Sequence, residues 1–495
     1  MDERERPPAI TRRQALALGV AGAATLGTGA LLGTALGSRL GAPSGSSGGA
    51  WSEPEVIGSV DGVLDLDLTV DRAEVELGGA TVSMLAYNGT VPGPTLHLHP
   101  GDRLRVHLRN RLDEPTNLHT HGLVVSAQGN ADNPFVHIRP GATFDYEIDL
   151  PDDHPAGVFW YHPHLHGRVA DQLFGGLYGA IVVDGDDWSD SAPRVVVVSD
   201  VTLAGGGVAA VTRAERMLGR TGKLLLANGA VAPRLPVTPG LAQRLLLINA
   251  CASRYLDLRL AGLDARLRGR DSGPSTDEPI DRLVVVPGGR ADVVVTAPSE
   301  PADIVAVGYD RGRGMGMMAG GSTAAPDAVL LGLDPDTSAP GSAASAPAAA
   351  GTETPTPVAA APRDLRTSPV DRIRTLTLSM GMQGMGTGMG FLIDGRAFDP
   401  DRVDQTVALG AVEEWTIRNT SSMDHPFHLH IWPMQTVRTE AGEPDGIDLR
   451  DVVDVPAGGS VVVRIAFDRF PGRTVYHCHV LDHEDLGMMG VIEAG

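Results

Sequence analysis

The sequence predicts an all-β protein in which three Greek-key β-sandwich domains follow an N-terminal targeting segment. Three observations predict this fold class. One spacing of residues occurs three times along the chain, a strand-like block follows each copy, and 495 residues are too many for a single hydrophobic core.

The repeated spacing runs from a Gly to an Asn nine residues later, and nine more residues lead to a third position. The three residues are Gly101, Asn110 and His119 in the first copy, Gly240, Asn249 and Leu258 in the second, and Gly410, Asn419 and His428 in the third. Two matched spacings in three copies indicate an internal repeat.

The second shared block is a Pro/Gly turn followed by an alternating or β-branched run, at 140–150, 287–297 and 456–467. Runs of this kind bounded by turns are typical of strands. Together the two blocks place the three domains at 52–190, 191–333 and 370–495.

Two segments fall outside these domains. Residues 334–369 are rich in Ala, Pro, Ser and Thr, a composition that cannot bury a core, and are predicted to form a flexible linker. Within residues 1–50, Arg12 and Arg13 precede an uncharged run rich in Ala, Gly and Leu, which resembles the twin-arginine signal for export across the bacterial inner membrane. Export predicts a periplasmic, cell-surface or secreted protein. The alternative is a permanent anchor, because about 20 apolar residues can span a bilayer.

Charge and cysteine content exclude some classes of function. The net charge of −21 disfavours binding to nucleic acid and to anionic membranes, and it favours attraction of cations. Two cysteines, Cys251 and Cys478, do not make the framework of a disulfide-rich protein.

Eight of the sixteen histidines form four His-x-His pairs within the repeated blocks or at equivalent positions after them. On a strand, residues i and i+2 face the same side, so each pair aims two imidazoles at one point. These eight cluster histidines are His119/His121, His162/His164, His428/His430 and His477/His479. The repeat places two pairs in domain one and two at equivalent positions in domain three. Domain two has Leu258, Leu260, Val307 and Tyr309 there. The pattern predicts a metal cluster shared by domains one and three, rather than eight unrelated structural histidines.

Cys478 lies between His477 and His479, so on a strand its side chain faces the opposite side and serves a second metal site. Three further residues fit that site: His425, His483 and Met488. A thiolate, two imidazoles and a weak axial thioether form a blue-copper electron-transfer site. Zinc is the alternative metal, but it has no use for an axial Met or for two sites on one strand.

Four motifs carry a family resemblance: "HTHG" (119–122), "WYHPH" (160–164), "HPFHLH" (425–430) and "HCHVLDHEDLGMM" (477–489). They look like the four copper motifs of the multicopper oxidases, and the resemblance covers all three domains. It implies a laccase-like architecture of three cupredoxin-like Greek-key β-sandwich domains with four copper ions as cofactors.

The resemblance also implies which residues hold each copper. His119 and His428 would hold the type 2 copper. One type 3 copper would bind to His121, His162 and His479, and the other to His164, His430 and His477. The type 1 copper would bind to the type 1 group, which consists of His425, Cys478, His483 and Met488. His166 lies outside the pattern and is expected either to support a ligand from outside the coordination sphere or to be structural.

The implied reaction is one-electron oxidation of a donor coupled to four-electron reduction of O2 to water. Glu484, directly after His483, matches a carboxylate that supplies protons in bacterial relatives. Asp132, eleven residues after His121, is a second candidate for proton supply. The alternative for both carboxylates is a solvated loop position.

Methionines predict the electron donor. Half of the 14 methionines fall in two short windows in which glycine excludes a stable helix: Met315, Met317, Met318 and Met380, Met382, Met385, Met389. Thioethers are soft ligands that prefer Cu(I), and Met423 and Asp424 directly precede His425. This resembles the bacterial cuprous oxidases of copper tolerance, although Ser421 stands where those relatives have a docking carboxylate. The alternative is a flexible loop that covers the site.

Three functions therefore compete. The first is a copper-tolerance oxidase that acts on Cu(I), with Fe(II) as a second metal donor. The second is a laccase that acts on phenols and aromatic amines. The third is a non-enzymatic copper-binding protein, against which the complete ligand set argues.

Overall fold

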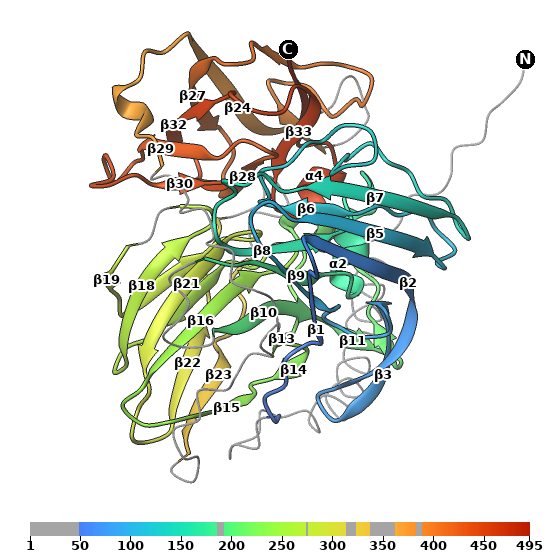
Figure 1. Cartoon of the computed structure of the whole chain (residues 1–495), viewed down its shortest axis with the longest axis vertical. Helices are drawn as coiled ribbons and strands as arrows, with labels where there is room; N and C mark the ends of the chain where they lie inside the picture. Colours follow the sequence, from blue (N-terminus) through green and yellow to red (C-terminus); the bar gives the residue numbers. More distant parts are fainter. Residues whose placement is uncertain (1–48, 186–192, 274–275, 313–322, 337–361, 383–388) are drawn as a thin grey trace, which may run out of the picture. The chain divides into compact units, whose positions relative to one another are not determined.

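The computed structural model describes residues 49–185, 193–273, 276–312, 323–336, 362–382 and 389–495. Within these ranges the chain is nearly all β, which confirms the predicted fold class. The strands form six sheets, and three hydrophobic cores show that the sheets pack in pairs as an N-terminal, a middle and a C-terminal sandwich (Figure 1).

The N-terminal sandwich contains the first of the equivalent histidine strands. Its elements are β1 (Val56–Gly58), β2 (Val63–Leu77), β3 (Ala80–Tyr87), β4 (Thr95–Leu98), β5 (Arg103–Asn110), β6 (His119–His121), β7 (Thr143–Asp149), β8 (Gly157–His162), α2 (Val169–Gly175), β9 (Gly179–Val183), β11 (Leu203–Ala204) and β12 (Gly207–Val208). One sheet has the order β1-β4-β9-β8-β6 and the other β11-β12-β3-β2-β5-β7. Along β5, buried and more exposed residues alternate, as expected for a strand with one face on the core.

The middle sandwich has no paired histidines. Its elements are β10 (Arg194–Val201), α3 (Arg213–Leu218), β13 (Leu224–Ala227), β14 (Ala230–Val231), β15 (Arg234–Val237), β16 (Ala242–Asn249), β17 (Leu256–Arg259), β18 (Asp264–Arg270), β19 (Glu278–Pro279), β20 (Arg282–Val285), β21 (Arg290–Thr296), β22 (Ala302–Val307) and β23 (Ala328–Pro335). The sheet orders are β14-β13-β10-β16-β21-β18-β19 and β15-β23-β22-β17-β20.

The C-terminal sandwich contains Cys478. Its elements are η3 (Leu365–Thr367), β24 (Arg372–Met382), β25 (Met389–Ile393), β26 (Gln405–Val407), β27 (Val412–Asn419), β28 (His425–Leu429), β29 (Met434–Arg438), β30 (Leu449–Arg450), β31 (Val452–Val455), β32 (Ser460–Ala466), β33 (Gly472–Cys478), α4 (Leu481–Asp485) and β34 (Met489–Ala494). The sheet orders are β25-β24-β27-β32-β29-β30 and β26-β34-β33-β28-β31.

The repeated Asn has the same task in each sandwich. Asn110, Asn249 and Asn419 end β5, β16 and β27, and all three are fully buried. Each side-chain amide donates two hydrogen bonds of 2.7–3.0 Å to backbone carbonyls: Glu114 and Ile138, Arg254 and Val285, Met423 and Val455. A buried carbonyl needs a partner. The repeated Asn therefore satisfies the same kind of buried turn in each of the three sandwiches.

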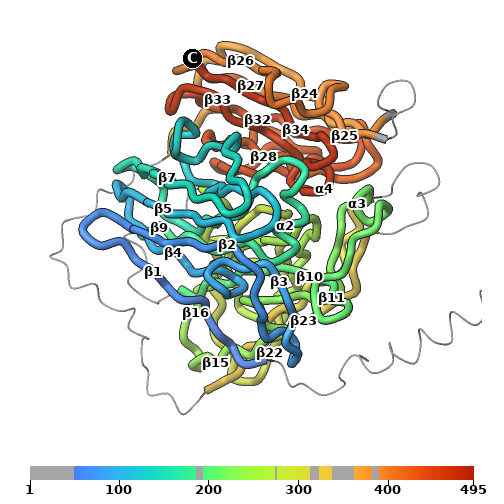
Figure 2. The backbone as a smooth tube through the Cα atoms, turned by 90° about the vertical axis from the view of Figure 1, so that its right-hand side faces the viewer, coloured from blue at the N-terminus to red at the C-terminus, as the bar shows by residue number. Residues whose placement is uncertain are grey.

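The sandwiches are joined by shared structure. The β11–β12 hairpin follows β10 of the middle sandwich, yet β12 pairs with β3 of the N-terminal sandwich. A fourth hydrophobic cluster combines residues of both sandwiches with Leu481 of α4. Helix α4 contacts α2 and α3, so all three parts of the chain meet at this helix (Figure 2).

The linker predicted for 334–369 is ordered at both ends. Asp334 forms an ion pair with Arg234. Leu365 is buried, and its N–H lies 2.6 Å from Gln435 Oε1. The composition of the segment concealed these local contacts, and residues 337–361 lie outside the described ranges. The predicted export signal also lies outside them. Among the described residues, no helix combines the length and apolar character needed to cross a bilayer.

Candidate copper centres

The structure brings the eight cluster histidines together at the junction of the N-terminal and C-terminal sandwiches. All eight are buried. Their ring nitrogens form three sets in which the atoms lie within 4.8 Å of one another: His121, His162 and His479; His164, His430 and His477; His119, His428 and His430. Each set mixes residues from both sandwiches.

Imidazole rings of the N-terminal and C-terminal sandwiches contact one another directly. The rings of His119 and His430 stack with centroids 4.0 Å apart, and His121 stacks on His428 at the same distance. The Nε2 atoms of His164 and His477 are 3.0 Å apart. Neutral imidazoles gain little from such crowding, and a shared ion accounts for it directly.

In only one of the four pairs do both histidines lie on the same strand, as the sequence predicted. His119 and His121 both lie on β6, whereas His164, His430 and His479 each lie just beyond the strand that carries their partner. For β8 the cause is Pro163, which has no N–H to continue the ladder. The second imidazole of these pairs therefore reaches the cluster from a turn.

Several imidazoles are anchored at Nδ1 with Nε2 directed inward. Nδ1 lies 2.9 Å from Asp132 in His119, 2.8 Å from the Pro163 carbonyl in His162 and 2.8 Å from the Asp451 carbonyl in His428. The Nε2 atoms of these three histidines have no hydrogen-bond partner. Such anchoring fixes the tautomer of a metal ligand.

The donor set fits a metal cluster. In addition to these Nε2 atoms, both ring nitrogens of His121 and His479 and Nδ1 of His430 are buried without a partner. Burial lowers the pKa of all eight imidazoles, with His164 and His477 at about 4. They are neutral at physiological pH, as metal ligands must be.

The type 1 group forms a separate buried site within the C-terminal sandwich. His425 Nδ1 lies 3.3 Å from Cys478 Sγ and 3.3 Å from His483 Nδ1. Cys478 Sγ is 4.0 Å from His483 Nδ1. Met488 is fully buried in the same hydrophobic cluster as Cys478, and its carbonyl accepts the Cys478 N–H at 3.0 Å. Two imidazoles and a thiol with a thioether nearby suit copper.

Strand β33 links the two sites. His477 pairs with His428, and Cys478 pairs with Phe427 of the same strand, β28. Cys478 belongs to the core of the C-terminal sandwich, whereas His477 and His479 belong to the histidine sets. The residue order His-Cys-His therefore puts two sites one residue apart, as expected from strand alternation.

The two candidate carboxylates differ in their contacts. Asp132 accepts the Thr120 N–H at 2.8 Å and lies against His119 Nδ1, so it orients that imidazole. Glu484 is fully buried, and neither of its oxygens has a hydrogen-bond partner. Its Oε2 lies 3.0 Å from His477 Nδ1 and its Oε1 3.6 Å from His164 Nε2.

Neither carboxylate is a solvated loop residue. Burial raises the pKa of Asp132 to about 7, against hydrogen bonds from Thr120 that lower it. Burial likewise raises the pKa of Glu484 to about 7, and its electrostatic interaction with His164 opposes that rise. A carboxyl group with a pKa near neutrality can hold and release a proton at working pH.

The middle sandwich contributes residues that the sequence did not indicate. Arg290 is fully buried and pairs with Asp451, whose Oδ2 lies 3.6 Å from His121 Nδ1. A Cβ on Gly288, which has φ +82°, would stand 2.7 Å from His479 Nε2, so only glycine fits against that ring. A lone Asp or Arg in an apolar run has no spacing that could reveal such contacts.

Three of the candidate donor-binding residues are buried or nearly so. Met380 is 8% exposed and Met423 is fully buried, so neither presents a thioether to solvent. Asp424 is 9% exposed and accepts hydrogen bonds from the Tyr309 hydroxyl and the Ala457 N–H. A role of these three residues in Cu(I) binding stays a prediction. Methionine packs adaptably, and Met380 and Met423 fill the core.

The other methionines are not placed. Only the backbone of Met382 and Met389 is described, as the last pair of the β24–β25 hairpin. Met385, Met315, Met317 and Met318 lie outside the described residues. His166 is exposed and rests on Phe398, with ring centroids 4.6 Å apart.

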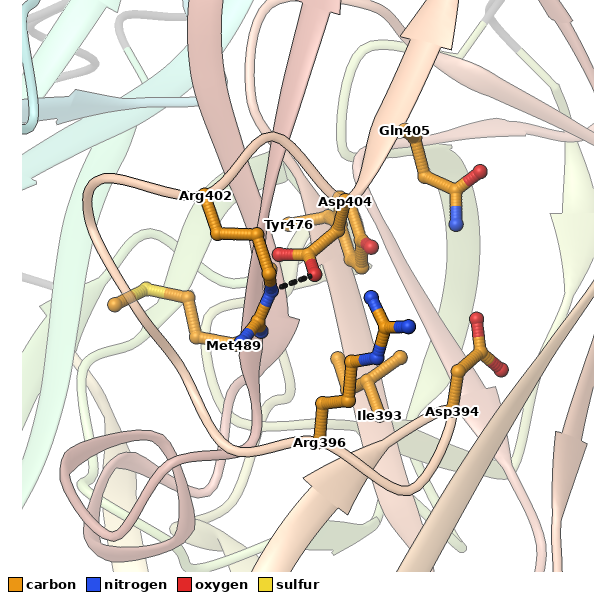
Figure 3. Close-up of a pocket in the computed structure, with 9 residues that line it drawn as sticks. Ile393, Asp394, Arg396, Arg402, Asp404, Gln405, Tyr476 and Met489 are labelled. Carbon is orange, nitrogen blue, oxygen red and sulfur yellow. Dashed lines mark hydrogen bonds and ion pairs between the residues drawn. The ribbon is translucent and has the colours of Figure 1, made fainter.

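A pocket of about 220 Å³ in the C-terminal sandwich contains none of the predicted ligands (Figure 3). It is lined by Ile393, Asp394, Arg396, Arg402, Asp404, Gln405, Tyr476, Met489 and Gly490. Arg402 Nε and Asp404 Oδ1 form an ion pair of 2.6 Å inside it. The pocket is therefore separate from both histidine-rich sites.

Comparison with known proteins supports the copper chemistry. Two family models described as multicopper oxidase match residues 69–187 and 368–495. The chain is 27% identical over 424 residues to the multicopper oxidase mco of Staphylococcus aureus, covering 83% of each chain. It is 26% identical over 577 residues to a copper resistance protein A homolog of Pseudomonas syringae, covering 89% of this chain and 94% of that one.

A laccase of Bacillus stratosphericus is 24% identical over 469 residues, covering 81% and 89%. A solved structure of a multicopper oxidase from Campylobacter jejuni, titled a metallo-oxidase, superposes with a TM-score of 0.74 at 28% identity, covering 91% of this chain and 96% of that one. Fold and matches together define a copper-dependent oxidoreductase with O2 as electron acceptor. The chain belongs to the multicopper oxidase family, which confirms the resemblance stated from the four motifs.

Proposed function

We propose that this enzyme couples one-electron oxidation of a metal ion, Cu(I) first and Fe(II) second, to four-electron reduction of O2 to water, in copper tolerance. The observation that carries the choice of donor concerns the described residues from which the two methionine-rich segments begin. Both begin at residues that touch the surroundings of the type 1 group, as the next two paragraphs describe.

The first segment begins and ends at the last described pair of the β24–β25 hairpin, Met382 and Met389. Phe391, two residues after Met389, stacks on His483 with ring centroids 4.0 Å apart and an interplanar angle of 14°. The hairpin that carries Met382 and Met389 is thus in direct contact with a type 1 residue.

The second segment starts after Gly312. This glycine forms an isolated β-bridge with Met423, and the Asp424 N–H donates to the Arg311 carbonyl at 2.7 Å. His425 of the type 1 group follows directly. Soft thioethers near this point would favour a Cu(I) donor over a phenol.

The proposal includes four copper ions. The type 1 group would hold one, His119 and His428 the type 2 ion, and the two sets His121, His162, His479 and His164, His430, His477 one type 3 ion each. Bound copper would supply one-electron chemistry at the type 1 group and multi-electron chemistry toward O2 at the cluster.

The chain's own residues then have distinct tasks. Cys478 provides a covalent connection of one peptide bond to His477 on one side and to His479 on the other. Glu484, which lies against His164 and His477, would hold a proton for O2 reduction. Asp132 would fix the orientation of His119 and serve as a second proton store.

Two further points support a role in copper tolerance. The P. syringae relative is named for copper resistance and the C. jejuni structure for metal oxidation. We also propose that Arg12 and Arg13 direct export of the folded protein, which would place the oxidase where external copper arrives.

Steady-state kinetics with Cu(I), Fe(II) and a phenol test the proposal. Replacing Met382, Met385 and Met389 together with Ser should raise KM for Cu(I) about tenfold and leave phenol turnover unchanged, because serine offers no soft ligand. Met380→Leu is the matched control: its side chain is buried, so KM for Cu(I) should not change. An unchanged KM in the triple variant, with a kcat/KM for the phenol above that for Cu(I), would favour the laccase function instead.

A further inference from the structure

Arg311, in the segment after β22, is a buried cation of the middle sandwich. Its side chain is 2% exposed. Nη2 donates to the Leu218 carbonyl at 2.6 Å and reaches the Gly219 carbonyl at 3.4 Å, at the C-terminal end of α3. Nη1 has no hydrogen-bond partner, and the guanidinium carbon lies 6.0 Å from the ring centroid of Tyr255. Within the described part of the chain, no ion pair joins Arg311 to a carboxylate. A buried, unpaired charge is costly, so a function should justify it.

This cation lies between the segments that carry two type 1 residues. On one side, the Arg311 carbonyl accepts the N–H of Asp424, the residue before His425. On the other side, a Cβ on Gly219 would stand 2.8 Å from Arg311 Nη2 and 2.6 Å from Val480 Cγ1. The Val480 N–H in turn lies 3.4 Å from Cys478 Sγ.

The nearby carboxylates are engaged elsewhere. Asp454 accepts the Tyr255 hydroxyl at 2.7 Å, and the hydroxyl of Tyr309 donates to Asp424 at 3.0 Å. Asp482 is paired with Arg220 at 2.6 Å. A hydroxyl donor does not neutralise a carboxylate, so Asp424 and Asp454 offset part of the Arg311 charge without forming an ion pair with it. Removal of the guanidinium alone still takes one positive charge away from the surroundings of the type 1 group.

We propose that Arg311 is a positioning residue of electrostatic kind, which raises the reduction potential of the type 1 copper from the middle sandwich. The inference rests on the proposed copper function. A thiolate with Cu(II) has a net charge of plus one, whereas a thiolate with Cu(I) is neutral. One electron from the donor removes that charge, so a fixed neighbouring cation disfavours the oxidised form and favours electron uptake.

The size of the effect follows from Coulomb's law. A unit charge roughly 10 Å from a redox centre, at an effective dielectric constant of about 20, changes a one-electron equilibrium by about tenfold, which corresponds to about 59 mV. Arginine is suited to this task because its guanidinium stays protonated even when buried.

The test is an equilibrium redox titration of the copper-loaded full chain against a soluble one-electron mediator, followed by the type 1 absorption band. Three variants separate charge from packing. Arg311→Gln keeps hydrogen-bond donors for the Leu218 carbonyl without the charge, Arg311→Met keeps the length without charge or donors, and Arg311→Lys keeps the charge.

The reduction equilibrium of the type 1 copper is expected to depend on the charge of residue 311. The Gln and Met variants should be about tenfold harder to reduce, and the Lys variant should stay near the parent protein, with the band shape and copper content unchanged in all of them. If the Met variant does not fold, the Gln and Lys variants give the same comparison.

Two results would overturn the inference. One is an unchanged equilibrium in the Gln variant with the type 1 band intact. The other is a Lys variant that shifts as far as the Gln variant, because the guanidinium would then act through packing alone. Absence of the type 1 band in the parent protein would instead refute the proposed copper function itself, which keeps the two failures distinct.

Discussion

The two candidate copper sites are assembled from different amounts of the chain. The C-terminal sandwich alone supplies the type 1 group, from β28, β33, α4 and the residue before β34. The cluster histidines come from two sandwiches, and the middle sandwich adds Arg290 and Gly288. The type 1 group is thus a property of one sandwich, whereas the cluster is a property of how three of them dock.

The docking contacts concentrate on α4 and on Arg290. In α4, Asp482 pairs with Arg220, and Asp485 accepts N–H groups at the start of α2, including that of Ala170 at 2.9 Å. Between them, His483 belongs to the type 1 group and Glu484 touches the cluster histidines. One short helix therefore couples docking to both sites, and the two sites should respond differently when single contacts are removed.

The largest effect is expected for Cys478→Ser. Without the thiolate, the blue absorption should disappear, turnover should fall to background, and copper content should drop by about one ion per chain, while the cluster histidines keep theirs. Visible spectra and metal analysis of the purified variant check this. A variant that stays intensely blue contradicts the assignment of Cys478.

Arg290→Met should affect the cluster and leave the type 1 group intact. It leaves Asp451 buried without its cation, so the free energy of unfolding should fall by about 3–5 kcal/mol. Because Asp451 faces His121, copper should be lost from the cluster while the type 1 absorption remains. Metal analysis, spectra and denaturant unfolding measure the three quantities.

Arg254→Met is the matched control for that variant. Arg254 is buried in the same sandwich and pairs with Asp200 at 2.9 Å, away from the histidine sets. A similar loss of stability is expected, with cluster copper retained. Equal copper loss in both variants would show that Arg290 acts only through general stability.

Glu484→Gln should separate the sites kinetically. The neutral amide cannot deliver a proton, so O2 reduction should slow by about 100-fold or more, while reduction of the type 1 copper by the donor stays fast. Stopped-flow spectra resolve the two phases. Slower reduction of the blue band, rather than of its reoxidation, would assign Glu484 to donor binding.

The smallest effect is expected for Met488→Leu. Leucine fills the same buried volume but cannot act as a weak axial ligand, so copper should remain bound and the potential should rise. A redox titration of the blue band measures the change. Loss of type 1 copper from this variant would mean that Met488 is a strong ligand.

Local spacing in the sequence was enough to predict the fold class and a shared cluster of eight histidines, whereas the assignment of histidines to each copper came from the family resemblance. The repeated Asn110, Asn249 and Asn419 each satisfy two buried carbonyls, so the same spacing had to recur in each sandwich. The His-x-His pairs likewise follow from short segments near strand ends. Such features are encoded within a few residues and need no knowledge of the remaining fold.

Long-range contacts could not be predicted in this way. The pairing of β12 with β3 and the ion pair of Arg290 with Asp451 join segments that are far apart in sequence. The methionines show a different limit. Glycine-rich composition predicted the absence of a helix in both windows, and most of their residues lie outside the described ranges. Met380 lies on β24, and its side chain is buried in the core.

The most direct test of the account is copper analysis of the purified full chain together with its visible and electron paramagnetic resonance spectra. The account predicts about four copper ions per chain, one of which produces the intense thiolate band of the type 1 group. A chain that is saturated by one ion, or that binds zinc without any such band, would contradict the claim that one strand serves two copper sites.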